Sequence, residues 1–174
     1  MSGSLIVVDK EIVSSSVSSV TLTGISSTFD VYRLEFSNVY ASADDDMQIR
    51  VTTGGTADSD SEYDIASKDL KTSAAFGNTS GTGLTQWDFS AGIGTSGQNS
   101  HNGNMYLFNF NNANEYSFIT MENVTKRTDA SDELFGFQGG GVHTVTEAND
   151  GIQFFITGGG TFDGGRFVLY GYKK

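Results

Sequence analysis

The sequence contains no cysteine and no proline among its 174 residues. Without cysteine the chain has no disulfide framework, thiolate metal site or cysteine nucleophile, so hydrophobic burial has to stabilise it. A single domain of this length buries about 70% of the surface that its extended chain exposes, which is enough for an ordinary core. We therefore predict one domain over residues 1–174, and we expect it to use no cofactor.

Positive charge is also scarce. The chain has 10 Lys and Arg residues against 21 Asp and Glu residues, which gives a formal net charge of −11. An acidic surface repels phosphate backbones and anionic lipids, so it argues against nucleic-acid and membrane partners. The first apolar stretch, residues 5–8, ends at Asp9 and is far too short for a signal peptide or a membrane span. We expect a protein made in a cytoplasm.

Glycine and aromatic residues, by contrast, are plentiful. The chain has 22 glycines, and aromatic residues make up 12% of it. Apolar and polar residues alternate in short runs, in one of which Tyr32, Leu34 and Phe36 share a face. The same alternation occurs in residues 47–51 and 152–156. A period of two predicts antiparallel strands that have one buried face and one wet face.

Three further runs are apolar on both faces, which is typical of central strands or of strands whose outer face meets a partner. They are residues 105–110, 116–121 and 167–172. Weaker runs at residues 5–8, 17–22 and 85–89 bring the expected number of strands to about nine. No window shows a sustained helical period. The predicted fold is therefore all-β, an antiparallel two-sheet β-sandwich of jelly-roll type, with the glycine-rich residues 157–166 as a wide hairpin connection.

Few residues suggest chemistry. Asp44, Asp45 and Asp46 form the densest acidic group and are weak candidates for a metal site, but a solvated turn explains them as well. His101 and His143 lie in glycine-flanked segments that we interpret as loops, and no G-x-S-x-G motif links a serine to either. We therefore predict neither a metal site nor enzymatic activity.

Aromatic side chains beside amides and glycines suit the faces of sugars, although most aromatic residues of a sandwich belong to its core. Segments near residue 87, residues 99–104 and residues 135–143 would form such a site. The candidate glycan contacts are Trp87, His101, Asn102, Phe135 and His143.

Both ends of the chain resemble a known group of proteins. Residues 17–40, VSSVTLTGISSTFDVYRLEFSNVY, followed by MQIRVTTGG at residues 47–55, are similar to β-sandwich virion proteins of tailed bacteriophages, especially marine ones. Residues 151–172, GIQFFITGGGTFDGGRFVLYGY, look like the last hairpin of the same group. The resemblance implies a non-enzymatic structural protein of the virion, synthesised in the host cytoplasm, that serves as a capsid decoration, a head fibre or part of a tail fibre.

The expected partners are phage capsid or fibre proteins and further copies of the chain, with a trimer as the expected oligomer. Residues 1–13 are predicted either to attach the protein to another subunit's sheet edge or to close its own sandwich. The candidate attachment residues are Leu5, Ile6, Val7, Val8, Ile12 and Val13. The alternative function is a receptor-binding module that recognises host glycans.

Overall fold

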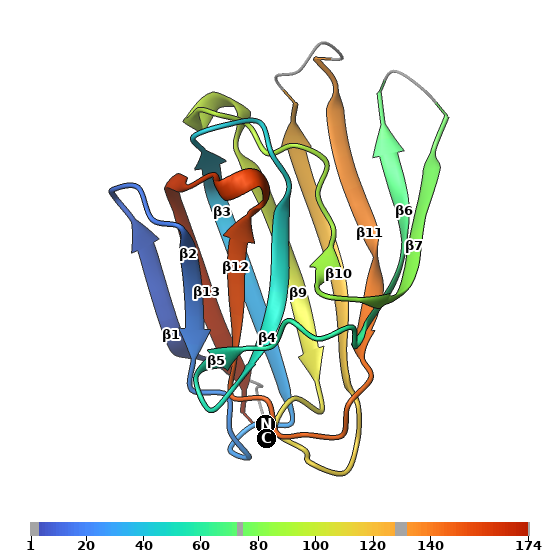
Figure 1. The fold of residues 1–174 in the computed structure, drawn as a ribbon. Coiled ribbons are helices and arrows are strands. Elements are labelled where there is room, and N and C mark those ends of the chain that lie inside the picture. Colours follow the sequence, from blue (N-terminus) through green and yellow to red (C-terminus); the bar gives the residue numbers. More distant parts are fainter. Residues whose placement is uncertain (1–3, 73–74, 128–131, 174) are drawn as a thin grey trace.

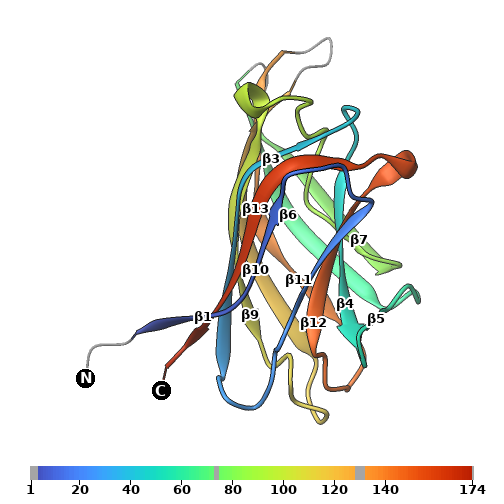
Figure 2. The same ribbon diagram turned by 90° about the vertical axis from the view of Figure 1, so that its left-hand side faces the viewer.

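The structure is a computed structural model that describes residues 4–72, 75–127 and 132–173. In this part of the chain thirteen strands form two antiparallel sheets that face each other (Figures 1 and 2). The predicted β-sandwich is thus confirmed. Sheet A has the order β1 (Leu5–Val13), β13 (Phe162–Tyr172), β3 (Val31–Ala41), β9 (His101–Phe108), β10 (Ser117–Lys126), β11 (Leu134–His143), β6 (Tyr63–Lys71) and β7 (Gly77–Leu84).

Sheet B is smaller. Its order is β2 (Ser19–Thr23), β12 (Gly151–Ile156), β4 (Met47–Thr53) and β5 (Thr56–Ala57), and β8 (Trp87–Asp88) also pairs with β4. Two short 3-10 helices, Gly97–Asn99 and Thr157–Gly159, lie in connections. No helix among the described residues has the length and apolar character needed to cross a membrane.

Eight of the strands pair in the order of a jelly roll, β1-β13-β3-β9 in one sheet and β2-β12-β4-β8 in the other. The strands β10, β11, β6 and β7 widen sheet A beyond this framework. The core lies between the sheets, because the inward residues of each strand are apolar and bury against the opposite sheet. Its fully buried members include Leu22, Leu34, Ile49, Val51, Trp87, Met105, Leu107, Ile152, Phe154, Phe162, Phe167 and Leu169.

The expected number of strands, about nine, is too low. Strands β5, β6, β7 and β11 are absent from the prediction because no apolar alternation runs along their length; β7, for example, reads GNTSGTGL. His101 begins β9 and His143 ends β11, so neither histidine lies in a loop. Residues 157–166 are not a hairpin connection, because β12 belongs to sheet B and β13 to sheet A.

Strand β1 is bent by a bulge between Val7 and Asp9. The extra residue, Val8, turns inward and packs against the core. Beyond the bulge, the Asp9 carboxylate accepts a 2.7 Å hydrogen bond from the Thr23 amide of β2, which ties this half of β1 to sheet B. The other half projects from the body, together with the end of β13 (Figure 2). Residues 1–3 of the predicted attachment segment lie outside the described residues.

Candidate functional site

The projecting ends of β1 and β13, residues 5–7 and 170–172, are here called the terminal arm. Leu5, Ile6 and Val7 are 42%, 41% and 57% exposed. Successive residues of a strand point to opposite faces, so the arm presents apolar side chains on both of its faces. The arm is held together by the pairing of Leu5 with Tyr172 and by a 3.1 Å bond from the Lys173 amide to the Ser4 carbonyl.

Aromatic side chains continue this apolar surface across the outer face of sheet A. The rings of Tyr106 and Tyr172 stack with centroids 6.1 Å apart, and those of Tyr106 and Phe108 are 6.4 Å apart. Phe118 pairs with Phe108 across β9 and β10 and is 44% exposed. The hydroxyls of Tyr172 and Tyr106 share a hydrogen bond, which raises the pKa of Tyr172. We call Tyr106, Phe108, Phe118, Tyr170 and Tyr172 the aromatic band.

The arm and the aromatic band together form a surface suited to protein contacts. β1 is an edge strand of sheet A, so it offers backbone donors and acceptors that another strand can pair with. Large exposed apolar patches on soluble proteins mark interaction sites more often than single exposed residues do. Among the predicted attachment residues, Ile12 is also exposed, at 59%. Val8 and Val13, in contrast, are partly buried and pack against the core.

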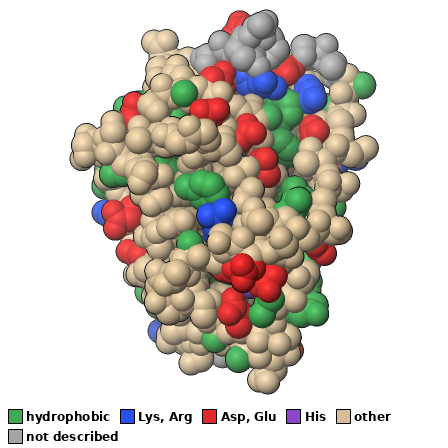
Figure 3. All heavy atoms as spheres, viewed as in Figure 1, with side chains coloured by type: hydrophobic (Ala, Val, Ile, Leu, Met, Phe, Trp, Pro, Cys, Tyr) green, Lys and Arg blue, Asp and Glu red, His purple; other side chains and the backbone are tan. Residues whose placement is uncertain are grey.

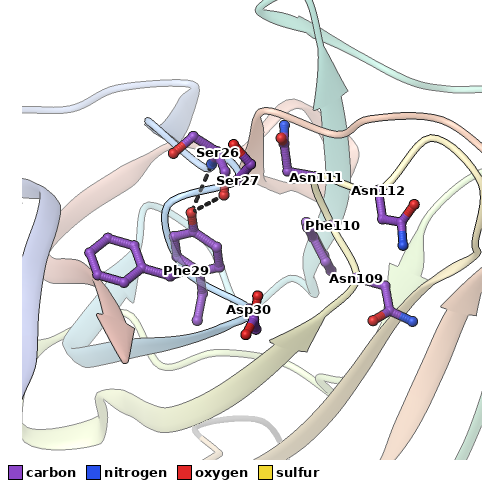
Figure 4. Close-up of a pocket in the computed structure, with 9 residues that line it drawn as sticks. Ser26, Ser27, Phe29, Asp30, Asn109, Phe110, Asn111 and Asn112 are labelled. Carbon is purple, nitrogen blue, oxygen red and sulfur yellow. Dashed lines mark hydrogen bonds between the residues drawn. The ribbon is translucent and has the colours of Figure 1, made fainter. Parts of the chain in front are cut away.

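A polar hollow of about 310 Å³ lies at the end of the sandwich, between the β2–β3 and β9–β10 connections (Figure 4). The first connection supplies Ser26, Ser27, Phe29 and Asp30, and the second supplies Asn109, Phe110, Asn111 and Asn112. The Tyr32 hydroxyl braces the hollow, donating to the Ser26 carbonyl at 2.6 Å and accepting from the Ser26 amide at 2.7 Å. An aromatic ring beside amides, hydroxyls and a carboxylate can bind a small polyhydroxylated ligand.

The glycan contacts expected from the sequence do not form a surface site. Trp87, His101 and His143 are 0% exposed and Phe135 is 3% exposed, so none of these rings offers a face to a sugar. They were candidates because the sequence does not show which face of a strand is buried. Asn102 is half-buried; its side chain bonds the Asn38 amide and the Ser100 carbonyl, and it lines a shallow hollow on the outer face of sheet A.

The two histidines have different surroundings. His101 stacks on Phe36 with parallel rings 5.1 Å apart, and burial lowers its pKa to about 3. His143 instead lies beside acidic side chains, with its Nε2 2.8 Å from the Asp58 carboxylate. Within the described ranges neither imidazole makes a hydrogen bond with a serine, so no serine–histidine pair of a hydrolase forms there.

The acidic group at residues 44–46 holds loops together. The Asp46 carboxylate accepts a 2.6 Å hydrogen bond from the Gly92 amide, and the Asp45 carbonyl accepts one from the Ile93 amide. In the described part of the chain, possible metal-ligand atoms converge in a second group, which consists of Asp58, His143 and Glu147. Those of the three aspartates do not converge in this way. The sequence gives no signal of this second group, because its members are up to 89 positions apart and only the pairing of β11 with β6 brings them together.

Comparison with known proteins finds no match to this chain among family models, curated proteins or solved structures. The hollow of Figure 4 could be anticipated only in part. Its amides come from a run in which Asn109, Asn111 and Asn112 follow an apolar strand, a composition that indicates an exposed polar loop. The contribution of Ser26 and Phe29 depends on the packing of β3 against β9.

Proposed function

We propose that the protein is a non-enzymatic structural module of a bacteriophage virion, which decorates the capsid or an attached fibre and assembles as a homo-oligomer. Assignment to a phage particle rests on the resemblance of residues 17–55 and 151–172 to virion proteins. The jelly-roll order of the strands supports it, because this architecture recurs in viral capsid proteins. Many copies on a symmetric particle bind with high avidity, so each single contact can be modest.

The exposure of three consecutive apolar residues on the terminal arm is the observation that carries this proposal. Leu5, Ile6 and Val7 keep about half of their surface exposed, at 42%, 41% and 57%, so the described residues bury these apolar side chains only in part. A strand edge with apolar side chains on both faces matches the requirements of β-strand addition, in which backbone bonds provide affinity and side-chain pockets provide specificity. The mechanism is adhesion through the arm and the aromatic band.

Introducing charge on the arm is expected to abolish assembly without unfolding the protein. In the double variant Leu5→Asp/Val7→Asp, two carboxylates would have to be buried in the contact, which strongly disfavours association. Exposed substitutions change stability by about 0.5 kcal/mol or less, so the melting temperature should stay within about 2 °C. Light scattering coupled to size-exclusion chromatography should show an oligomer for the wild type and a monomer for the variant.

Phe76→Asp is the matched control. Phe76 is 66% exposed but lies near the β6–β7 turn, away from the arm, so this variant should assemble like the wild type. Retained assembly in the arm variant, or a wild-type chain that stays monomeric at high concentration, would contradict attachment between copies through the arm.

A second function, recognition of host glycans by a receptor-binding module, is favoured by the hollow of Figure 4. Phe29 supplies a ring that a sugar can stack on, and Asp30 and Asn111 supply polar groups that hydroxyls can bond. Ligand sites in proteins combine apolar walls with a few placed polar groups in this way, and the volume of the hollow is close to the lower bound for such sites.

Loss of side chains from this hollow is expected to weaken glycan binding at least tenfold, which corresponds to about one hydrogen bond to a charged or amide group. The measurement is a glycan array followed by titration, with Asp30→Asn and Asn111→Ala as variants. Asn104→Ala, on the outer face of sheet A, is the control and should bind normally. If the wild-type chain gave no sugar-dependent signal, the glycan-binding function would be contradicted, and only the structural role would remain.

A further inference from the structure

Three carboxylates surround one buried imidazole where β11 ends. Nε2 of His143 is 2.8 Å from Asp58 Oδ2 and 3.6 Å from Glu62 Oε2, while its Nδ1 is 3.9 Å from Glu147 Oε1. Asp58 and Glu62 belong to the segment between β5 and β6, and Glu147 follows β11 in the chain. On the face of the molecule shown in Figure 3, acidic side chains gather over the segment that joins β5 to β6.

The group has a surplus of negative charge. No Lys or Arg among the described residues forms an ion pair with Asp58, Glu62 or Glu147. Even a doubly protonated His143 would leave two negative charges uncompensated if all three carboxylates were ionised. Burial raises the pKa of the Glu62 carboxyl, and repulsion by the neighbouring Asp58 carboxylate raises it further. A bound cation would relieve this repulsion.

The surroundings of the imidazole are a second, independent observation. The His143 side chain is 0% exposed, and its Nδ1 makes no hydrogen bond. Both ring nitrogens face carboxylates, which only accept hydrogen bonds when ionised, so each nitrogen needs either a proton or a metal ion. A metal ion on Nε2 leaves the proton on Nδ1, the side of the ring on which Glu147 Oε1 lies 3.9 Å away. This is the arrangement in which a carboxylate orients a metal-binding histidine.

We propose that His143, Asp58 and Glu62 bind one divalent transition-metal ion of the Zn²⁺ class through Nε2 and the two carboxylates, with Glu147 orienting the ring. The imidazole is already near the required spacing from each carboxylate. Ligands that bind an ion at about 2.0–2.2 Å lie roughly 3–3.6 Å from one another, and the two distances from Nε2 are 2.8 Å and 3.6 Å. An imidazole with carboxylates prefers Zn²⁺ or a similar ion to Ca²⁺ and Mg²⁺, which favour sites made only of oxygen.

The backbone around the site is preorganised. The Asp60 amide donates to Asp58 Oδ1 at 2.8 Å, which fixes the Asp58 carboxylate and leaves Oδ2 directed at His143. The Thr53 hydroxyl, on β4, donates to Glu147 Oε1 at 3.0 Å. Because Glu62 is 35% exposed, an ion can enter from solvent although the imidazole is buried. The ion would fasten the β5–β6 segment to the end of β11, independently of the proposed attachment role.

Metal-depleted full-length protein titrated with ZnCl₂ at neutral pH is expected to bind one ion per chain, measured by calorimetry and elemental analysis. Binding to the folded state alone raises the melting temperature, and we expect a rise of several degrees at saturation, with little change on adding CaCl₂ or MgCl₂. The chain has only two histidines, so nuclear magnetic resonance gives an internal control. The ring signals of His143 should shift with Zn²⁺, and those of His101 should not.

Glu62→Gln and His143→Gln are expected to weaken Zn²⁺ binding at least tenfold. Glu62 is partly exposed, so its variant stays folded and remains informative if His143→Gln is unstable. Asp45→Asn, in the other acidic group, is the matched control and should bind one ion with wild-type affinity. Failure of the wild type to take up one ion per chain, or wild-type affinity in Glu62→Gln, would overturn the proposal.

Discussion

Replacing Trp87 by alanine is expected to lower the free energy of unfolding by about 4 kcal/mol and the melting temperature by roughly 8–16 °C. The indole is 0% exposed, and it contacts the Tyr63 ring edge-on with centroids 5.1 Å apart. Its Nε1 donates to the Val142 carbonyl at 3.3 Å. Trp87 belongs to β8 of sheet B and Val142 to β11 of sheet A, so truncation leaves a large cavity between the two sheets. Thermal and urea unfolding measure the loss.

A double-mutant cycle with Gly141 separates this packing effect from a general weakening of the fold. A β-carbon at Gly141 would lie 2.6 Å from Trp87 Nε1, so Gly141→Ala should destabilise the wild type by driving β11 and the indole apart. In the Trp87→Ala background the indole is gone, and the added cost of Gly141→Ala should fall by at least about 1 kcal/mol. If Trp87→Ala instead kept full stability while losing sugar binding, the indole would be a surface contact and its placement in the core would be wrong.

The contrast between β3 and β7 shows which strands a sequence can predict. Tyr32, Leu34 and Phe36 of β3 alternate with polar residues because one face of the strand packs against the other sheet, and this burial pattern is visible in the sequence. Strand β7 contains a single apolar residue, Leu84, and exists because it pairs with β6 at the edge of sheet A. Its stability comes from backbone pairing with the preceding strand and not from an apolar face of its own, so an apolar pattern cannot show it.

The functional surfaces likewise have features that the sequence predicts and features that it does not. The apolar N-terminal run predicted an edge strand, but the bulge at Val8, which separates the terminal arm from the body, has no sequence signature. Trp87 and Phe135 were assigned to a surface although strand pairing places them inside. The site at His143 depends on the register that sets this residue opposite Tyr63, since that register brings the end of β11 to the segment containing Asp58 and Glu62. Side chains 85 positions apart give no spacing to interpret.

The protein is expected to lose stability as the pH falls from about 6.5 toward 3, and His101 should account for much of the loss. Burial lowers the pKa of this imidazole to about 3, whereas in the unfolded chain it is about 6.5. Between these values the unfolded state binds a proton that the folded state does not, so stability decreases as the pH decreases. At 1.36 kcal/mol per pH unit, the contribution of His101 at pH 4 is a loss of about 3 kcal/mol. Urea unfolding measured at several pH values gives the slope.

His101→Leu isolates this contribution, because every other titrating group is the same in both proteins. Leucine is of similar size, stays uncharged and buries no nitrogen, whereas neither His101 nitrogen has a hydrogen-bond partner. The variant should therefore be at least as stable as the wild type at pH 7, and the difference in its favour should grow by about 3 kcal/mol between pH 7 and pH 4. Parallel stability curves for the two proteins would mean that His101 takes up a proton in the folded state near its ordinary pKa. The imidazole would then have access to water or to a charged partner, and its buried stacking on Phe36 would not hold.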